Sequence, residues 1–351
     1  MIAIVDKALR DKAITSFLNE AGWKDAQAAP LAGDASNRRY LRIAEANAKA
    51  VLMDAPPETG EDTAPFIAVT EWLLSQGLSA PNLFASDGEK GFLLIEDLGD
   101  ALFARYLESE PDDEELLYTA AVELLVELSR CPLPAAMGTN AISLHPYDMS
   151  VLEREAALLT EWWLPAASGK DATSRIDAEY RELLRELFAP VAGARDVVVL
   201  RDYHAENLLW LPDRSSHAKV GLLDYQDALA GHAAYDLVSL LEDARRDTTL
   251  KLQEAMLNHY LDQRPDLERT LFRRDYALLG AQRNLKIVGI FARLWLRDGK
   301  PQYLDLIPRV WNHLMHDLSH PDLTALREWI DVHVPAPDAV TLDRVRAGAG
   351  S

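Results

Sequence analysis

Apolar positions in the first hundred residues switch between helical and strand spacing. Residues 7–21 carry apolar side chains on one helix face, and Gly22 then supplies a stop signal. A second helix is predicted over 63–76, where apolar residues again recur every three to four positions. Short apolar runs predict strands at 39–43, 50–53 and 92–95. This part of the chain therefore predicts a small sheet with two accompanying helices.

Helical spacing dominates after Gly99, and one β-rich island interrupts it. Predicted helices cover 113–130, 150–163, 173–188, 234–246, 249–263, 275–296 and 301–318. The island contains a strand ending near Leu200 and two further strands at 208–211 and 220–224. The Gly-rich end, 346–351, predicts a frayed tail.

The last two strands of the island predict a hairpin, because the polar turn 212–216 joins them. Asn207 and Asp224 stand at the open end of this hairpin. We therefore expect an α+β fold of two lobes. A small β-rich amino-terminal lobe would cover residues 1–98, and a large, mainly helical lobe would cover 99–351 and hold the hairpin.

Three polar residues of the island predict its chemistry. Asp202 precedes Asn207 by five positions, and Asp224 directly follows an apolar strand. This is the spacing of a kinase catalytic loop followed by a metal-binding aspartate. Asp202 is the candidate base for an attacking hydroxyl, while Asn207 and Asp224 offer the hard oxygen ligands that Mg²⁺ prefers. Each residue alone could simply cap a loop, but the set predicts phosphoryl transfer.

The residues expected to hold the phosphates are less clearly marked. Gly33, Ser36 and Asn37 form either a phosphate-covering turn or an ordinary turn before the first predicted strand. Met53 stands where a kinase strand carries the lysine that binds ATP, and Glu71 is either its acidic partner or a solvated helix residue. A replacement cation could come from Arg38, Arg39, Arg42 or Lys49.

Other polar residues are candidates for contacts with the phosphoryl acceptor. His204 lies inside the catalytic loop and either touches the acceptor or braces the loop. Arg283 and Lys286 lie on a largely apolar helix, where they face either an acceptor cleft or solvent. Asp236 begins a helix, and we expect it to hydrogen-bond back to the catalytic loop in a structural role.

At these motifs the chain resembles the aminoglycoside phosphotransferase/choline kinase-like superfamily, which has a protein-kinase-like two-lobe fold. The resemblance extends from Gly33 to about Leu318 and rests on the segments 33–42, 53–57, 201–207, 223–228 and 282–286. Within that superfamily it is similar to the bacterial kinases of cell-wall recycling that phosphorylate N-acetylmuramate and N-acetylglucosamine at C1. Leu200 departs from the superfamily pattern, which has His there.

The resemblance implies a site with ATP or GTP and Mg²⁺. It implies a base at Asp202 and metal ligands at Asn207 and Asp224. It also implies a nucleotide held at the hinge by Glu96 and Leu98. The flanking residues of the same motifs add Gln226 and Asp227 to the acceptor candidates.

Composition narrows the remaining classes of function. The net charge of −20 disfavours binding to nucleic-acid phosphates or to an anionic membrane surface. No apolar run reaches 18 residues, no signal peptide is evident, and Cys131 is the only cysteine, so we expect a cytoplasmic protein. We also expect a monomer that acts on a small molecule. Two alternatives stay open: a kinase for choline or an aminoglycoside, which the negative charge would suit, and a nucleotide-binding pseudokinase, because the lysine is missing.

Overall fold

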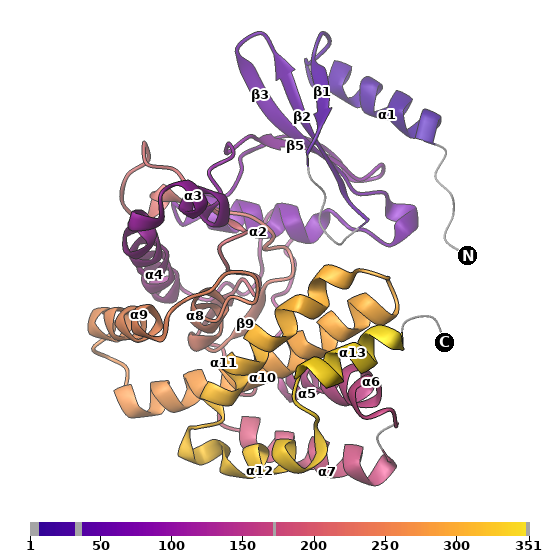
Figure 1. The fold of residues 1–351 in the computed structure, drawn as a ribbon. Helices are drawn as coiled ribbons and strands as arrows, with labels where there is room; N and C mark the ends of the chain where they lie inside the picture. The colour runs from indigo at the N-terminus through magenta and orange to yellow at the C-terminus, as the bar shows by residue number, and fades with distance from the viewer. Residues whose placement is uncertain (1–6, 32–36, 171–172, 349–351) are drawn as a thin grey trace. The chain divides into compact units, whose positions relative to one another are not determined.

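The computed structural model describes residues 7–31, 37–170 and 173–348 (Figure 1). The chain forms two compact units, which the text below calls the first and the second unit. The first unit comprises Met1–Ser109, Pro134–Leu144 and Glu206–Ala228, and the second comprises Glu110–Leu133, His145–Ala205 and Leu229–Ser351. The predicted hairpin therefore belongs to the same unit as the amino-terminal sheet, whereas Asp202 belongs to the second unit.

The first unit is built on a five-stranded antiparallel sheet with the order β1-β2-β3-β5-β4. Its strands are β1 Gln27–Pro30, β2 Arg39–Glu45, β3 Ala48–Asp54, β4 Leu83–Asp87 and β5 Phe92–Glu96, and its first two helices are α1 Lys7–Glu20 and α2 Ala64–Ser75. The three predicted strands and both predicted helices are confirmed. The strands β1 and β4 were not predicted, because β1 is exposed throughout and β4 is only half-buried.

Alternation along β3 gives the two faces of this sheet different partners. Ala50 and Leu52 join the core formed with Phe17 and Leu18 of α1, which packs along the sheet (Figure 1). Lys49, Val51 and Met53 point to the opposite face, because successive side chains of a strand alternate between its two faces. That opposite face carries the pocket described below.

The hairpin forms as predicted, with β7 Leu208–Trp210 paired to β8 Val220–Leu222. Backbone hydrogen bonds from both of its strands attach it to the rest of the first unit. The Leu222 N–H donates to the Ser79 carbonyl at 2.9 Å, and the Trp210 N–H donates to the Ala101 carbonyl at 2.8 Å. The short helix α3, Phe103–Ser109, follows Ala101 and packs the ring of Phe103 edge-on against Trp210. The hairpin is thereby fixed beside the end of the sheet.

The second unit is mainly helical. Its helices are α4 Glu114–Arg130, α5 Met149–Ala156, α6 Leu164–Ser168, α7 Ser174–Phe188, α8 Ala234–Leu241, α9 Leu250–Gln263, α10 Arg269–Leu296, α11 Ile307–Asp317, α12 Thr324–His333 and α13 Ala339–Ala347. The strands β6 Val197–Val199 and β9 Leu229–Gly231 form a small antiparallel pair. The end of α13 occupies the start of the predicted tail, and residues 349–351 lie outside the described residues.

One predicted helix is divided at the place where α10 packs closely against it. The helix predicted over 150–163 is divided, because a π-helical turn over Leu159–Trp163 follows α5. At Gly289 of α10, an added Cβ would lie 2.3 Å from the backbone carbon of Leu158. Glycine therefore permits α10 to approach the start of this turn more closely than any side chain would allow.

A pair of buried acids joins α8, α10 and α11 in the second unit. Glu242 and Asp317 are 2% and 3% exposed, and Asn284 donates to both, at 2.7 and 3.0 Å. Burial raises the pKa of Glu242 to about 7 and holds the pKa of Asp317 well above its usual value. These groups therefore keep protons in the folded chain at pH values where the unfolded chain has lost them.

We expect Asp317→Asn to flatten the dependence of stability on pH. In the wild type, raised folded-state pKa values make the free energy of unfolding fall as pH rises from about 4 to 7, by about 1.4 kcal/mol per pH unit for each retained proton. Urea unfolding between pH 5 and 8 measures that slope. Asp343→Asn, at an exposed position on α13, should keep the wild-type slope. An equal slope in Asp317→Asn would contradict the assignment.

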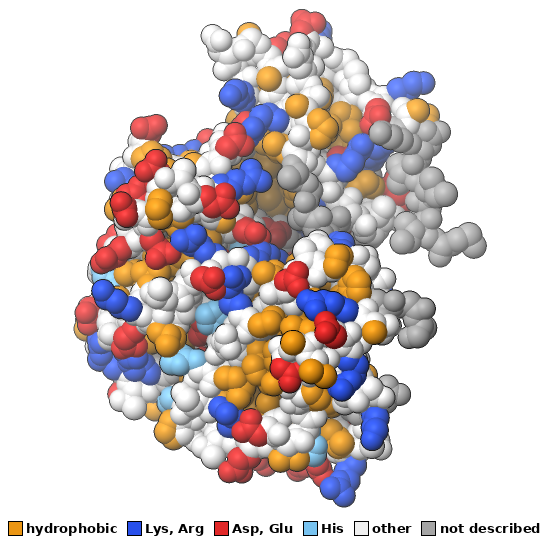
Figure 2. Space-filling model, viewed as in Figure 1, with side chains coloured by type: hydrophobic (Ala, Val, Ile, Leu, Met, Phe, Trp, Pro, Cys, Tyr) orange, Lys and Arg blue, Asp and Glu red, His pale blue; other side chains and the backbone are white. Residues whose placement is uncertain are grey.

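Charges of both signs are interspersed over the face shown in Figure 2, with no continuous basic patch there. Among the described residues, no helix is both long and apolar enough to span a bilayer.

Candidate active site

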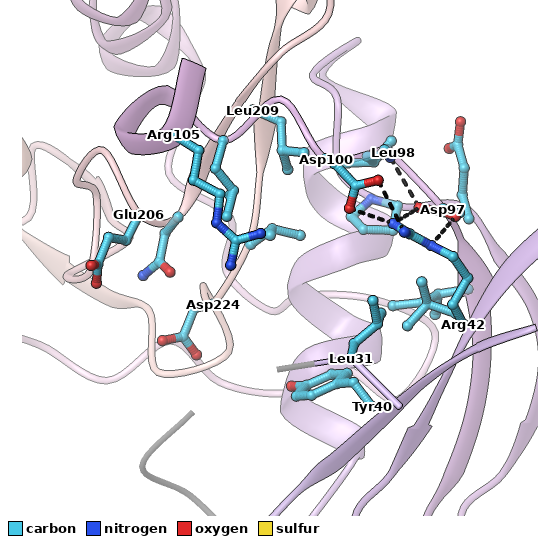
Figure 3. Close-up of a pocket in the computed structure, with 18 of the residues that line it drawn as sticks. Leu31, Tyr40, Arg42, Asp97, Leu98, Asp100, Arg105, Glu206, Leu209 and Asp224 are labelled. Carbon is cyan, nitrogen blue, oxygen red and sulfur yellow. Dashed lines mark hydrogen bonds and ion pairs between the residues drawn. The ribbon is translucent and has the colours of Figure 1, made fainter. Parts of the chain in front are cut away.

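A cavity of about 550 Å³ lies in the first unit, between the sheet and the hairpin (Figure 3). This volume is in the range of sites for small molecules and cofactors. Leu31 and Tyr40 enter from one side of the cavity and Leu209 from the other. Its apolar lining residues are Leu31, Val51, Phe66, Pro81, Ile95, Leu98, Leu102, Ala104, Leu209 and Leu223. These apolar walls suit a flat ring held between sheet and hairpin.

The predicted hinge forms part of the cavity wall. Glu96 and Leu98 both line it. The Glu96 carboxylate is held by Arg214 at 2.6 Å and by the Asn82 side-chain amide at 2.6 Å, so it is already engaged. The Leu98 backbone N–H, by contrast, has no hydrogen-bond partner among the residues that the structure describes. A ring system in the cavity could accept a hydrogen bond from this N–H.

Asn207 and Asp224 both line the same cavity, at its hairpin end. The Leu223 N–H donates to the Asn207 carbonyl at 3.0 Å, which continues the β7–β8 pairing by one step. Asp224 has a positive φ of 56°, a conformation that aspartate tolerates better than most residues. The Gln226 amide donates to one Asp224 carboxylate oxygen at 2.7 Å. The hairpin thus delivers two oxygen-bearing side chains to one end of the cavity.

Tyr225 anchors the turn that presents Asp224. Its ring is fully buried and stacks on Phe66 of α2, with ring centroids 5.2 Å apart. Its hydroxyl lies 2.7 Å from the Thr70 hydroxyl, also on α2. Because Tyr225 is fixed from both its ring and its hydroxyl, the backbone of Asp224 has little freedom to turn away from the cavity.

The donors at this end of the cavity fit Mg²⁺ better than they fit a metal held by protein alone. The predicted ligands comprise one carboxylate, from Asp224, and one amide oxygen, from Asn207, and the carboxylate of Glu206, next to Asn207 in sequence, also lines the cavity. In the described part of the chain, no group of three or more His, Cys, Asp or Glu side chains could hold an ion. Mg²⁺ keeps several waters and takes phosphate oxygens beside one or two carboxylates, so this small set is sufficient.

The loop that carries Asp202 is rooted in the second unit. The buried carboxylate of Asp236, at the start of α8, accepts hydrogen bonds from the Leu200 N–H at 2.6 Å and the Arg201 N–H at 2.8 Å. The structural role predicted for Asp236 is confirmed. Arg201 has a positive φ of 73°, and the Asp202 N–H turns back to the Leu200 carbonyl at 2.9 Å. Asp202 therefore projects from a tight turn whose backbone is held at both of its first two positions.

A buried ionic cluster supports the same loop from α5 and α10. Glu155, 7% exposed, pairs with Arg201, accepts from the Tyr147 hydroxyl and lies 3.2 Å from the Lys286 ammonium. Burial alone would raise the pKa of Glu155, but the charges of Lys286 and Arg201 outweigh it and hold that pKa below its usual value. Glu155 thus stays ionised and keeps the Arg201 side chain in place.

The remaining acceptor candidates occupy different environments. His204 is 5% exposed, and burial lowers its pKa to about 4, so its ring is neutral at pH 7. Arg283 is 5% exposed and donates to the Glu242 carbonyl at 3.4 Å. The alternative that Arg283 faces solvent is therefore wrong. Gln226 lines the cavity, whereas Asp227 is exposed and does not.

The predicted phosphate-covering turn lies mostly outside the described residues. Gly33 and Ser36 fall there, and Asn37 is exposed and does not line the cavity. Glu71 does not enter the cavity either. It accepts from the Thr139 N–H at 2.6 Å, and Phe66 is the residue of α2 that lines the wall.

The three arginines considered as substitutes for the lysine are each paired with an acid. A fourth arginine, which the sequence pattern did not mark, also lies at the cavity. Arg39 binds the buried Asp54 at 2.8 Å, and Arg42 lines the cavity but pairs with Asp97 and Asp100. Arg38 pairs with Glu61 at 2.7 Å. Arg105 of α3 also lines the cavity. It lies in a seven-residue helix that was not predicted, so nothing in the motif spacing pointed to it.

A unit built on a five-stranded sheet with a hairpin and a second, mainly helical unit are the components of the protein-kinase-like two-lobe α+β fold. Among solved structures, choline kinase LicA from Streptococcus pneumoniae matches with a TM-score of 0.57 at 14% identity, covering 87% of this chain and 98% of that one. The predicted fold class is confirmed.

Sequence comparison identifies the family within that fold. The profile of the phosphotransferase enzyme family matches residues 27–272, so the chain belongs to this family. A Caulobacter vibrioides protein named N-acetylmuramate/N-acetylglucosamine kinase is 38% identical over 360 residues, covering 93% of this chain and 97% of the relative. A Pseudomonas putida protein of the same name is 32% identical over 330 residues, covering 91% and 93%. The resemblance noted from the motifs is confirmed.

Proposed function

We propose that the protein transfers a phosphoryl group from ATP or GTP to the anomeric hydroxyl of an amino sugar, N-acetylmuramate or N-acetylglucosamine. The observation that carries the proposal is the cavity end where the hairpin presents Asn207 and Asp224 together. The names of the relatives that match almost the whole chain support the choice of acceptor. Such a reaction belongs to peptidoglycan recycling, and its need for a nucleoside triphosphate favours the cytoplasm.

The cavity supports a nucleotide with its base between the apolar walls. Val51 of the sheet and Leu209 of the hairpin would flank the base, and the Leu98 N–H would donate to its edge. The phosphates would then extend toward Asn207 and Asp224. A Mg²⁺ ion held by these two residues would neutralise negative charge on the transferring phosphoryl group.

Asp202 would act on the acceptor hydroxyl. Its carboxylate accepts the hydroxyl hydrogen bond and takes up the proton as the oxygen attacks phosphorus. An anomeric hydroxyl is more acidic than an ordinary alcohol, so orientation matters more here than base strength. The tight turn held by Asp236 and the pairing of Arg201 with Glu155 provide that orientation. This chain's contribution is therefore mainly positioning and charge.

A panel of acceptors tests the proposal directly. The full-length protein is incubated with Mg²⁺ and either ATP or GTP and with N-acetylmuramate, N-acetylglucosamine, choline or an aminoglycoside. Phosphorus NMR then identifies the phosphorylated position. We expect sugar 1-phosphates from the two amino sugars and no product from choline or the aminoglycoside. A preparation of Asp202→Asn protein controls for contaminating kinases.

Each other outcome excludes part of the proposal. Phosphate on another sugar carbon would overturn the anomeric assignment. Turnover of choline or an aminoglycoside alone would favour the cationic-alcohol alternative. Mg²⁺-dependent nucleotide binding without turnover of any acceptor would favour the pseudokinase alternative.

A further inference from the structure

We infer that Arg105 is the protein cation that binds the phosphate chain of the nucleotide, in place of the lysine that β3 lacks. The inference rests on the proposed function, because it requires a nucleotide in the cavity. It concerns a residue of α3, on the far side of the hinge from β3, that belongs to none of the sequence motifs.

The cavity has an excess of acidic side chains, which a nucleotide triphosphate must overcome. Its acidic lining residues are Glu96, Asp97, Asp100, Glu108, Glu206 and Asp224. Its basic lining residues are only Arg42 and Arg105 among the described part of the chain. Several negative charges on the ligand would therefore meet a negative site, unless cations near the phosphates compensate for them.

Arg42 is already neutralised by two of those acids. Its Nε lies 2.7 Å from the Asp97 carboxylate and its Nη2 lies 2.8 Å from the Asp100 carboxylate (Figure 3). Asp97 is 6% exposed, so breaking its pair with Arg42 would leave a buried carboxylate unpaired. Arg42 is therefore committed to holding the hinge against β2.

The position of the missing lysine offers no charge. Met53 is 1% exposed on β3, and the α2 residue that lines the cavity is Phe66 rather than an acid. Met53 itself does not line the cavity, so neither β3 nor α2 supplies an ion pair that could clamp phosphates there. Glu71 has a different partner, because Thr139 binds it through both its N–H and its hydroxyl.

Arg105 is the cation of this cavity that has no direct partner in the described part of the chain. Its side chain forms no ion pair or hydrogen bond there, and its charge acts only at longer range on Asp100, which is already paired with Arg42. Phe103 and Leu107, at 0% and 2% exposure, fix α3 from its buried face, which leaves Arg105 on the exposed one. Figure 3 shows its guanidinium extending from α3 into the cavity, on the side where Asp224 lies. A planar fork of donors at this place matches phosphate oxygens.

Binding of a series of adenine ligands with three, two, one and no phosphates to the full-length protein tests this inference without reference to turnover. Calorimetry measures the Kd of ATP, ADP, AMP and adenosine, with Mg²⁺ present, for the wild type, Arg105→Ala and Arg105→Lys. We expect Arg105→Ala to weaken ATP and ADP about tenfold to a hundredfold and adenosine less than about twofold. Arg105→Lys should recover part of the loss, because it keeps the charge but not the fork.

The control is Arg175→Ala, which removes an 86% exposed arginine from α7 and should leave every Kd unchanged. Equal ATP affinity in the wild type and Arg105→Ala would overturn the inference. So would an equal loss for ATP and adenosine, because Arg105 would then act on the base or ribose. If the wild type binds none of the four ligands, the proposed nucleotide site itself is wrong. That result differs from the two outcomes that overturn only the role of Arg105.

Discussion

Asp202→Asn should lower turnover of the amino sugar by about 10²–10⁴-fold while leaving nucleotide affinity unchanged. Asparagine matches the size of the carboxylate but cannot take up the proton of the attacking hydroxyl. The loop should keep its shape, because Asp236 holds it through the backbone N–H groups of Leu200 and Arg201 rather than through Asp202. Asp202 is also not among the residues that line the cavity of the first unit, where we propose that the nucleotide binds.

Steady-state kinetics measures the expected loss of turnover, and calorimetry of ATP binding measures the unchanged nucleotide affinity. Asp213→Asn is a matched control, since Asp213 is an exposed aspartate in the turn of the hairpin, at the opposite end from Asn207 and Asp224. It should behave as the wild type in both measurements. Near-normal turnover by Asp202→Asn would remove Asp202 from the chemistry, and a parallel loss of ATP binding would point to damage to the fold instead.

The parts that could be predicted depend on local sequence. The hairpin follows from two apolar runs and a polar turn, and its ladder then brings Asn207 and Leu223 together without any long-range information. The helix α1 and strands β2 and β3 follow from their apolar spacing in the same way. Strand β1 could not be found, because all of its residues are exposed and only its pairing with β2 makes it a strand.

The partners of charged residues could not be predicted, because they are distant in sequence. Arg42 finds Asp97 and Asp100 only after the sheet and hinge have formed. Asn284 lies on a largely apolar helix, and only the packed fold shows that its amide lies between two buried acids, Glu242 and Asp317. Burial of polar groups in such pairs is a property of the packed fold, whereas periodicity reports only the average face of a helix. Arg105 could not be predicted for the same reason, because its proposed role depends on which other cations at the cavity are already paired.

Asp224→Asn should remove the dependence of nucleotide binding on Mg²⁺ and lower turnover by about a thousandfold or more. The substitution takes away the only carboxylate in the proposed pair of metal ligands and leaves two neutral amides, from Asn207 and the new side chain. Asparagine accepts a positive φ as readily as aspartate does, so the turn at 56° should persist. Tyr225, stacked on Phe66, holds the following residue in place.

Calorimetry of ATP binding with Mg²⁺ and with EDTA measures the expected change. The wild type and Asp213→Asn should bind ATP more tightly with Mg²⁺ than with EDTA, whereas Asp224→Asn should show one affinity in both conditions. Asp202→Asn should retain the full Mg²⁺ effect, so the two aspartates give opposite results in a single assay. If Asp224→Asn keeps the Mg²⁺ effect, the ion is held elsewhere, and the hairpin end of the cavity would serve the phosphates without a metal.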